Sequence, residues 1–182
     1  MKSENISSPS IREKLALFAS TAGGFGLLPG APGTWGTIPG VLIHMTIAQV
    51  FAPQYQAAAL ISVFLCTCAL SYFLTPWAQR YWNTKDPGRF VLDEVAGYLL
   101  VPILFRHGEL WQIALWGFLF FRLFDIIKPP PARQIDTAMK SAWGVLLDDL
   151  VSSFYTVAAL YLIMKIGYLF DISWWLTTND LK

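Results

Sequence analysis

Residues 144–164, GVLLDDLVSSFYTVAALYLIM, place two adjacent aspartates, Asp148 and Asp149, near the start of a long apolar run. Such a run lies in lipid or in a protein core, where an ionised carboxylate costs several kcal/mol unless a positive group meets it. We therefore expect one helix that carries both acids, and other elements that supply the compensating charge.

The composition separates this chain from ordinary soluble proteins. Of its 182 residues, 55% are hydrophobic and only 14% are charged, whereas globular chains carry roughly 25% charged residues. The net charge of +1 provides no basic field, so no nucleic-acid partner is expected. Cys66 and Cys68 lie inside an apolar run and predict packing rather than a disulfide framework or a zinc site.

Five apolar runs predict an all-α fold: a membrane-embedded bundle of about five helices with a Gly/Pro-rich N-terminal loop. The runs cover roughly residues 38–51, 57–77, 91–105, 110–127 and 145–170. The second and fifth are long enough to span about 30 Å of hydrocarbon. The others are shorter or carry charges, so a soluble bundle with a very apolar core remains their alternative. We expect a polar segment over 1–22, one helical domain over 23–170 and a tail over 171–182.

Basic residues concentrate in every second connection between these runs. They are Lys2, Arg12, Lys14, Arg80, Lys85, Arg89, Lys128, Arg133 and Lys140. The positive-inside rule then predicts a multi-pass protein with five spans and a cytoplasmic N-terminus, to which Arg106 is an exception.

This topology brings acidic side chains from three runs to the cytoplasmic membrane face. Asp93 and Glu94 begin the third run, and Asp125 lies near the end of the fourth. Asp148 and Asp149 are expected in the first turn of the fifth. Oxygen ligands without histidine or cysteine suit Mg²⁺ or Mn²⁺ rather than zinc. Capping is the alternative for the two pairs, because acids near a helix N-terminus gain about 0.3–1 kcal/mol from the helix dipole.

Basic side chains accompany these acids. Arg122 and Asp125 are three residues apart and share a helix face, and Lys128 follows after three more. The three prolines after Lys128 end the helix. Arg133 and Asp136 repeat the same spacing. A surface ion-pair ladder is the alternative, but such pairs stabilise little, whereas an arginine and a lysine beside a metal suit a phosphate group.

Residues 23–40, GGFGLLPGAPGTWGTIPG, contain seven glycines and three prolines, so we expect no regular helix there. The segment lacks the P-loop pattern. Glycines such as Gly33 allow close backbone approach to an anion, and Thr34 and Thr37 add hydroxyl donors. A simple turn before a membrane helix is the alternative. We interpret His44, in the first apolar run, as a packed or interfacial histidine rather than a ligand.

Four stretches carry a resemblance to a known family. They are GFGLLPGAPGTWGT (24–37), DPGRFVLDEVAG (86–97), FRLFDIIKPPPARQID (121–136) and WGVLLDDL (143–150). Through them, the chain resembles the phosphatidylglycerophosphatase A family over about residues 23–150. Signatures of the cysteine phosphatases, the aspartyl-phosphate hydrolases and the CDP-alcohol phosphotransferases are absent. One departure is Ser152 and Ser153, where the family usually has Ala-Gly; serine is still small enough for close helix packing.

The resemblance implies a helical, Mg²⁺-dependent enzyme of the bacterial cell inner membrane that converts phosphatidylglycerophosphate to phosphatidylglycerol. On this hypothesis, carboxylates hold one or two Mg²⁺ ions at the cytoplasmic interface, with Asp125 as an additional member of the set. The catalytic residues are then Asp93, Glu94, Asp125, Asp148 and Asp149. The metal-binding set is Asp93, Glu94, Asp148 and Asp149.

Substrate contacts are assigned to two further groups. Arg122, Lys128 and Arg133 are expected to bind phosphate oxygens, while the segment 23–37 closes over the headgroup. The bilayer is the other expected partner, and the oligomeric state is not predicted. The alternatives are an ion-coupled transporter that uses the same acids and a non-catalytic membrane scaffold.

Overall fold

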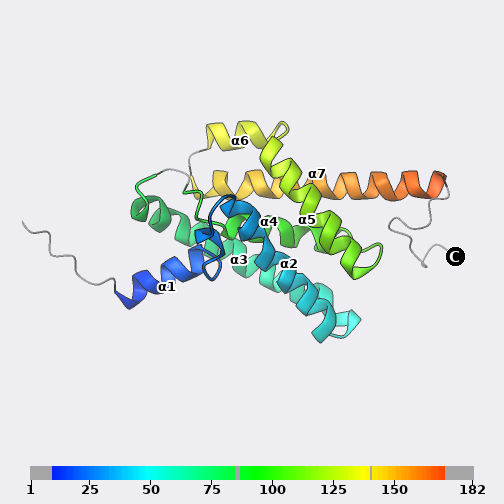
Figure 1. The fold of residues 1–182 in the computed structure, drawn as a ribbon, viewed down its shortest axis with the longest axis horizontal. Helices are drawn as coiled ribbons and strands as arrows, with labels where there is room; N and C mark the ends of the chain where they lie inside the picture. Colours follow the sequence, from blue (N-terminus) through cyan, green and yellow to red (C-terminus); the bar gives the residue numbers. More distant parts are fainter. Residues whose placement is uncertain (1–9, 85–86, 140, 171–182) are drawn as a thin grey trace, which may run out of the picture.

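In the computed structural model, which describes residues 10–84, 87–139 and 141–170, each apolar run becomes a helix, and these residues contain no strand. The all-helical prediction is therefore confirmed. The elements are α1 (Ile11–Ser20), η1 (Phe25–Leu27), α2 (Pro32–Val50), α3 (Pro53–Tyr81), α4 (Leu92–Leu104), α5 (Leu110–Ile127), α6 (Ala132–Ala138) and α7 (Ala142–Leu169). Figure 1 shows α1, α6 and the start of α7 at the same end of the molecule.

Helix α4 is the centre of the bundle. It packs against α2, α3, α5 and α7, and most of its side chains are buried, among them Tyr98, Leu99 and Val101. A helix that is apolar on all sides is stable only when other elements surround it. Its 13 residues extend about 20 Å, so α4 is a short core helix whose first turn carries Asp93 and Glu94, as predicted.

Three helices, α3, α5 and α7, are long and apolar enough to cross a membrane. Their outer faces expose large apolar side chains, such as Phe73, Leu119 and Phe154, as expected of surfaces that contact lipid. Runs 38–51 and 91–105 correspond to α2 and α4, which are not among these three. The five-span topology remains a prediction.

The expectation that residues 23–40 contain no regular helix is wrong for their second half, because α2 begins at Pro32. Proline is well suited to the first helical turn. Gly33, Gly36 and Gly40 recur at helical spacing and lie against the α4 region: Cβ atoms at Gly36 and Gly40 would lie 2.3 Å from Val91 and 3.1 Å from Tyr98. Close helix packing therefore outweighs the low helix propensity of glycine.

The position of the aspartate pair also differs from expectation. Helix α7 begins at Ala142, so Asp148 and Asp149 lie in its second turn rather than its first. Because the helix dipole acts mainly within the first turn, capping does not account for these two acids.

Helix α5 ends at Ile127, as the prolines predict, and its C-cap, Lys128, has the left-handed conformation, with φ 47°. Tyr155 of α7 donates a hydrogen bond to the carbonyl of Pro130 and so ties the proline loop to α7. The described part of the N-terminal segment contains α1. Lys2, Lys85, Lys140 and the tail 171–182 lie outside the described residues.

Candidate metal and phosphate site

Three carboxylates from two helices lie close together. One oxygen from each of Asp93 and Glu94 of α4 and Asp149 of α7 falls within 4.8 Å of the others, with Asp93 and Asp149 buried. The first turn of α4 and the second turn of α7 are adjacent because these helices pack side by side. The structure thus brings together acids that are 55 residues apart in the sequence (94 and 149).

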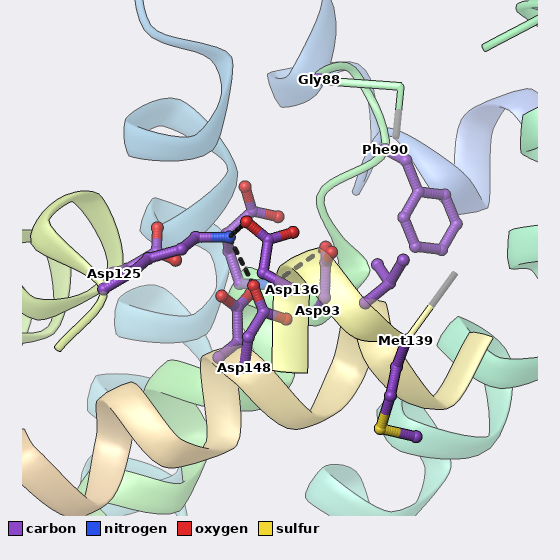
Figure 2. Close-up of a pocket in the computed structure, with 11 residues that line it drawn as sticks. Gly88, Phe90, Asp93, Asp125, Asp136, Met139 and Asp148 are labelled. Atoms are coloured by element: carbon purple, nitrogen blue, oxygen red, sulfur yellow. Dashed lines mark hydrogen bonds and ion pairs between the residues drawn. The ribbon is translucent and has the colours of Figure 1, made fainter. Parts of the chain in front are cut away.

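These acids line a pocket of about 160 Å³. Figure 2 shows carboxylates from α4, α5, α6 and α7 directed into it. Its wall also includes apolar residues such as Phe90, Met139 and Val145. The six carboxyl groups that line it are those of Asp93, Glu94, Asp125, Asp136, Asp148 and Asp149.

Lys128 supplies the positive charge inside this pocket. Its Nζ atom donates to Asp148 Oδ2 at 2.5 Å, as a dashed line in Figure 2 indicates, and lies 3.2 Å from Asp136 Oδ2. Burial by itself lowers the pKa of Lys128, but the ion pairs with these aspartates outweigh burial and raise the pKa above its ordinary value. The geometry and this direction of the pKa both favour a protonated Lys128 at neutral pH.

Arg122 forms a second ion pair behind the pocket. Its Nη1 atom lies 2.6 Å from Asp125 Oδ2, which confirms the shared helix face, and both side chains are largely buried. Gly33 lies directly beside this arginine: a Cβ there would lie 2.9 Å from Arg122 Nη2 and 2.6 Å from Glu94 Oε1. The absence of a side chain at Gly33 therefore lets Arg122 and Glu94 occupy their positions.

Several buried polar atoms in this region have no hydrogen-bond partner, among them Glu94 Oε2, Asp148 Oδ1 and Arg122 Nε. Burial raises the pKa of the Glu94 carboxyl to about 7, and the charge of Asp125 adds to the rise. The Glu94 carboxylate, one of whose oxygens has no partner, lies within ligand distance of Asp93 and Asp149, and such a group of oxygen ligands fits a hard divalent cation such as Mg²⁺. The grouped residues are thus chemically suited to Mg²⁺, and the group contains neither histidine nor cysteine.

Ser153 joins the two helices that carry the acids. Its hydroxyl donates to the carbonyl of Gly97 at 2.6 Å, and Gly97 leaves no space for a side chain, since a Cβ would lie 2.6 Å from Phe121. Ser153 and Gly97 are each four residues, about one turn, beyond Asp149 and Asp93. The Ser153 hydroxyl thus joins α4 and α7 by a hydrogen bond one turn beyond the acids.

Ser153→Ala is expected to lower the free energy of unfolding by about 1 kcal/mol, because it leaves the buried Gly97 carbonyl without this donor. Thermal unfolding in detergent would measure the change. Ser152→Ala is the matched control, since the Ser152 hydroxyl bonds only within its own helix, to the Asp148 carbonyl at 3.0 Å. An equal loss in both variants would contradict the interhelical role.

Other predicted site residues lie away from the pocket wall. Thr37 is fully buried and donates to the Gly33 carbonyl at 2.8 Å, and Thr34 lies half-buried in the first turn of α2. Gly26 of the segment 23–37 lies directly against the Arg89 carbonyl, whereas Leu27 and Leu28 are exposed, and closure of this segment over a headgroup stays a prediction. Arg133 is exposed on α6.

Asp136 is the site residue that sequence reasoning missed. Its spacing from Arg133 suggests a surface pair, whereas the structure places it against Lys128 and in the pocket wall. The only sequence signal was its position shortly after the proline loop. His44 is buried and its Nδ1 lies 3.1 Å from the Tyr98 hydroxyl, which agrees with a packed histidine.

Comparisons with known proteins agree on one family. The family model described as phosphatidylglycerophosphatase A matches residues 18–164. The chain is 29% identical to phosphatidylglycerophosphatase A of Haemophilus influenzae, over 77% of this chain and 83% of that protein. It is 27% identical to phosphatidylglycerophosphatase A of Escherichia coli, over 77% of this chain and 78% of that protein.

A third relative has a different name. It is a protein of Bacteroides thetaiotaomicron named "Putative phosphatidylinositol-3-phosphatase", 29% identical over 78% of this chain and 89% of its own length. No solved structure matches the chain.

Proposed function

Since the chain belongs to the phosphatidylglycerophosphatase A family and is a phosphoric monoester hydrolase, we propose that it hydrolyses phosphatidylglycerophosphate to phosphatidylglycerol with Mg²⁺ as cofactor. The main structural support for this proposal is the grouping of Asp93, Glu94 and Asp149 within 4.8 Å. A phosphomonoester bears nearly two negative charges at neutral pH. A pocket lined by six carboxyl groups repels such a substrate unless a cation offsets them.

The metal would be held by Asp93, Glu94 and Asp149, and the Asp148 oxygen without a partner lies in the same pocket. When bound, a divalent cation supplies charge neutralisation and Lewis-acid polarisation of the phosphate. The acids are tolerated at this buried position because the cation and the two basic side chains compensate them.

The chain's own residues bind and orient the phosphate. Lys128 presents its ammonium at the pocket wall, held there by Asp148 and Asp136, and its charge stabilises phosphate oxygens. Arg122 maintains the buried charge balance around Asp125 and Glu94. Hydrolysis adds the oxygen of water to phosphorus and breaks the bond to the glycerol oxygen, which leaves with a proton.

We propose further that the protein is a multi-pass protein of the bacterial cell inner membrane whose pocket opens on the cytoplasmic face. The support is the alternation of basic residues in the sequence, three helices of spanning length, and the position of α6 and the start of α7 at one end of the molecule (Figure 1). Acyl chains would stay in the bilayer against the exposed apolar faces of the bundle.

The test is phosphate release by the purified protein from phosphatidylglycerophosphate, with EDTA and then with excess Mg²⁺. We expect EDTA to stop the reaction and Mg²⁺ to restore it. Full activity in EDTA would exclude the metal proposal. A parallel assay with phosphatidylinositol 3-phosphate distinguishes the two lipid classes named among the relatives, and an ion-coupled transporter or a scaffold would release no phosphate from either.

Lys128→Met is expected to raise KM by roughly 10-fold or more, since a charge-assisted hydrogen bond contributes about 1.5–3 kcal/mol. Arg133→Met is the matched control: it removes one positive charge from the same loop region but from an exposed position on α6. Steady-state kinetics on lipid substrate would compare the two variants. An equal effect of both would assign Arg133 the substrate contact that its sequence position suggested.

A further inference from the structure

Helix α1 carries an apolar stripe that none of the residues described by the structure covers. Ile11, Leu15 and Phe18 are 70%, 61% and 64% exposed. Their spacing of four and three residues places them on one face, about 60° wide. The opposite side is occupied by the more buried Ala16, Leu17 and Ser20, so α1 rests on the bundle through one face and turns the apolar one outward.

Charges on α1 are arranged around this stripe. Arg12 and Lys14, both exposed, flank it on its two sides, whereas Glu13 lies nearly opposite, about 160° away. Glu13 is also engaged in a capping box, in which its carboxylate accepts from the Ser10 backbone at 2.8 Å. The outward face is therefore apolar with basic edges.

Exposed apolar side chains continue beyond α1. Leu27 and Leu28 after the following turn, and Trp35 in the first turns of α2, are also exposed. Helix α1 packs against α3, one of the three helices of spanning length. Figure 1 shows α1 reaching outward at the end of the molecule where α6 and the start of α7 lie.

We propose that α1 lies in the plane of the membrane interface, with Ile11, Leu15 and Phe18 inserted among the lipids and with Arg12 and Lys14 at anionic headgroups. A short amphipathic helix with basic residues beside a strong apolar face binds lipid surfaces in this way. The inference rests on the membrane embedding proposed above and is independent of the substrate.

The contacts of α1 link this anchor to the pocket. The Val91 backbone N–H donates to the carbonyl of Ser20, the last residue of α1, at 3.0 Å, and Val91 directly precedes α4. Gly26 packs against the Arg89 carbonyl in the same connection. The depth of α1 in the interface would therefore fix the depth of Val91, which directly precedes α4 and lies two residues before Asp93.

The test places a nitroxide on each side of α1 in the full chain, in nanodiscs of anionic phospholipid. Leu15→Cys and Glu13→Cys would be labelled in a background in which Cys66 and Cys68 are replaced by alanine. We expect the label at 15 to collide more with oxygen and less with a water-soluble nickel chelate, and the label at 13 to show the reverse. Nickel access at 15, lipid exposure at both positions, or spin–spin broadening from a second copy would each overturn the proposal.

A charge variant tests the contact between the basic edges of α1 and anionic headgroups. Arg12→Gln combined with Lys14→Gln should make the label at 15 shallower in anionic nanodiscs, with little change in zwitterionic ones. If the double variant changed the depth of the label at 15 equally in anionic and zwitterionic nanodiscs, the proposed contact with anionic headgroups would be wrong. Because the readout is lipid contact, failure of this inference is distinguishable from loss of phosphatase activity.

Discussion

Asp149→Asn is expected to reduce phosphate release by at least about 1,000-fold, which corresponds to roughly 4 kcal/mol of lost transition-state stabilisation. The substitution keeps the size of the side chain but removes the charge of a buried carboxylate that lies with Asp93 and Glu94. Binding of Mn²⁺, followed by electron paramagnetic resonance, should weaken in parallel. Fold and insertion should survive, because removing one of several mutually repelling carboxylates costs little stability.

The matched control for this variant is Asp136→Asn. Asp136 lines the same pocket but is considerably more exposed, and its partner is Lys128 rather than the three-acid group. We expect less than about a 10-fold loss there, since exposed ion pairs contribute little. Turnover near wild type in Asp149→Asn, with a correctly folded protein, would remove Asp149 from the metal-binding set.

Gly33→Ala is expected to lower activity by at least about 100-fold while leaving the protein as stable as wild type. The new Cβ would lie 2.6 Å from Glu94 Oε1 and 2.9 Å from Arg122 Nη2. Both atoms are the ends of flexible side chains, so they can move aside at small cost to the fold, but they leave the positions that the site needs. Alanine also favours the helix by about 1 kcal/mol.

Gly36→Ala is the contrasting variant one turn along the same helix. Its Cβ would meet the Cβ of Val91 at 2.3 Å, an atom fixed to the backbone, so α2 would have to move as a whole. We expect a clear loss of thermal stability in detergent, as for overpacked sites generally. If Gly33→Ala instead unfolded the protein or retained full activity, its assigned role beside Arg122 and Glu94 would be wrong.

The sequence predicted much of this arrangement because charge is informative in an apolar chain. Asp93 and Glu94 lie in the first turn of α4 as expected, and Arg122 pairs with Asp125 at the predicted spacing. From the alternation of basic residues alone, we expected the start of α4, the end of α5 and the start of α7 on the same side of the molecule. In a chain with few charges, each one is costly to bury, so its partners can be anticipated.

The features that the sequence did not predict depend on distances between helices. The low helix propensity of glycine argued against a helix at Gly33 and Gly36, whereas packing against α4 requires those glycines within one. Asp136 approaches Lys128 only because the proline loop turns α6 back toward α7. The bond from Ser153 to Gly97 joins residues 56 positions apart, which no local pattern encodes.

The left-handed backbone of Lys128 places a charged side chain where glycine would be less strained. With φ at 47°, this helix C-cap is a position where glycine is commonly found and where other residues incur roughly 1–2 kcal/mol of strain. Lys128→Gly would relieve this backbone strain, but it would remove the amine from the pocket and leave the buried Asp148 without its ion-pair partner. Backbone strain and charge compensation therefore act in opposite directions at this single position, where the helix end is strained by the same residue that neutralises Asp148.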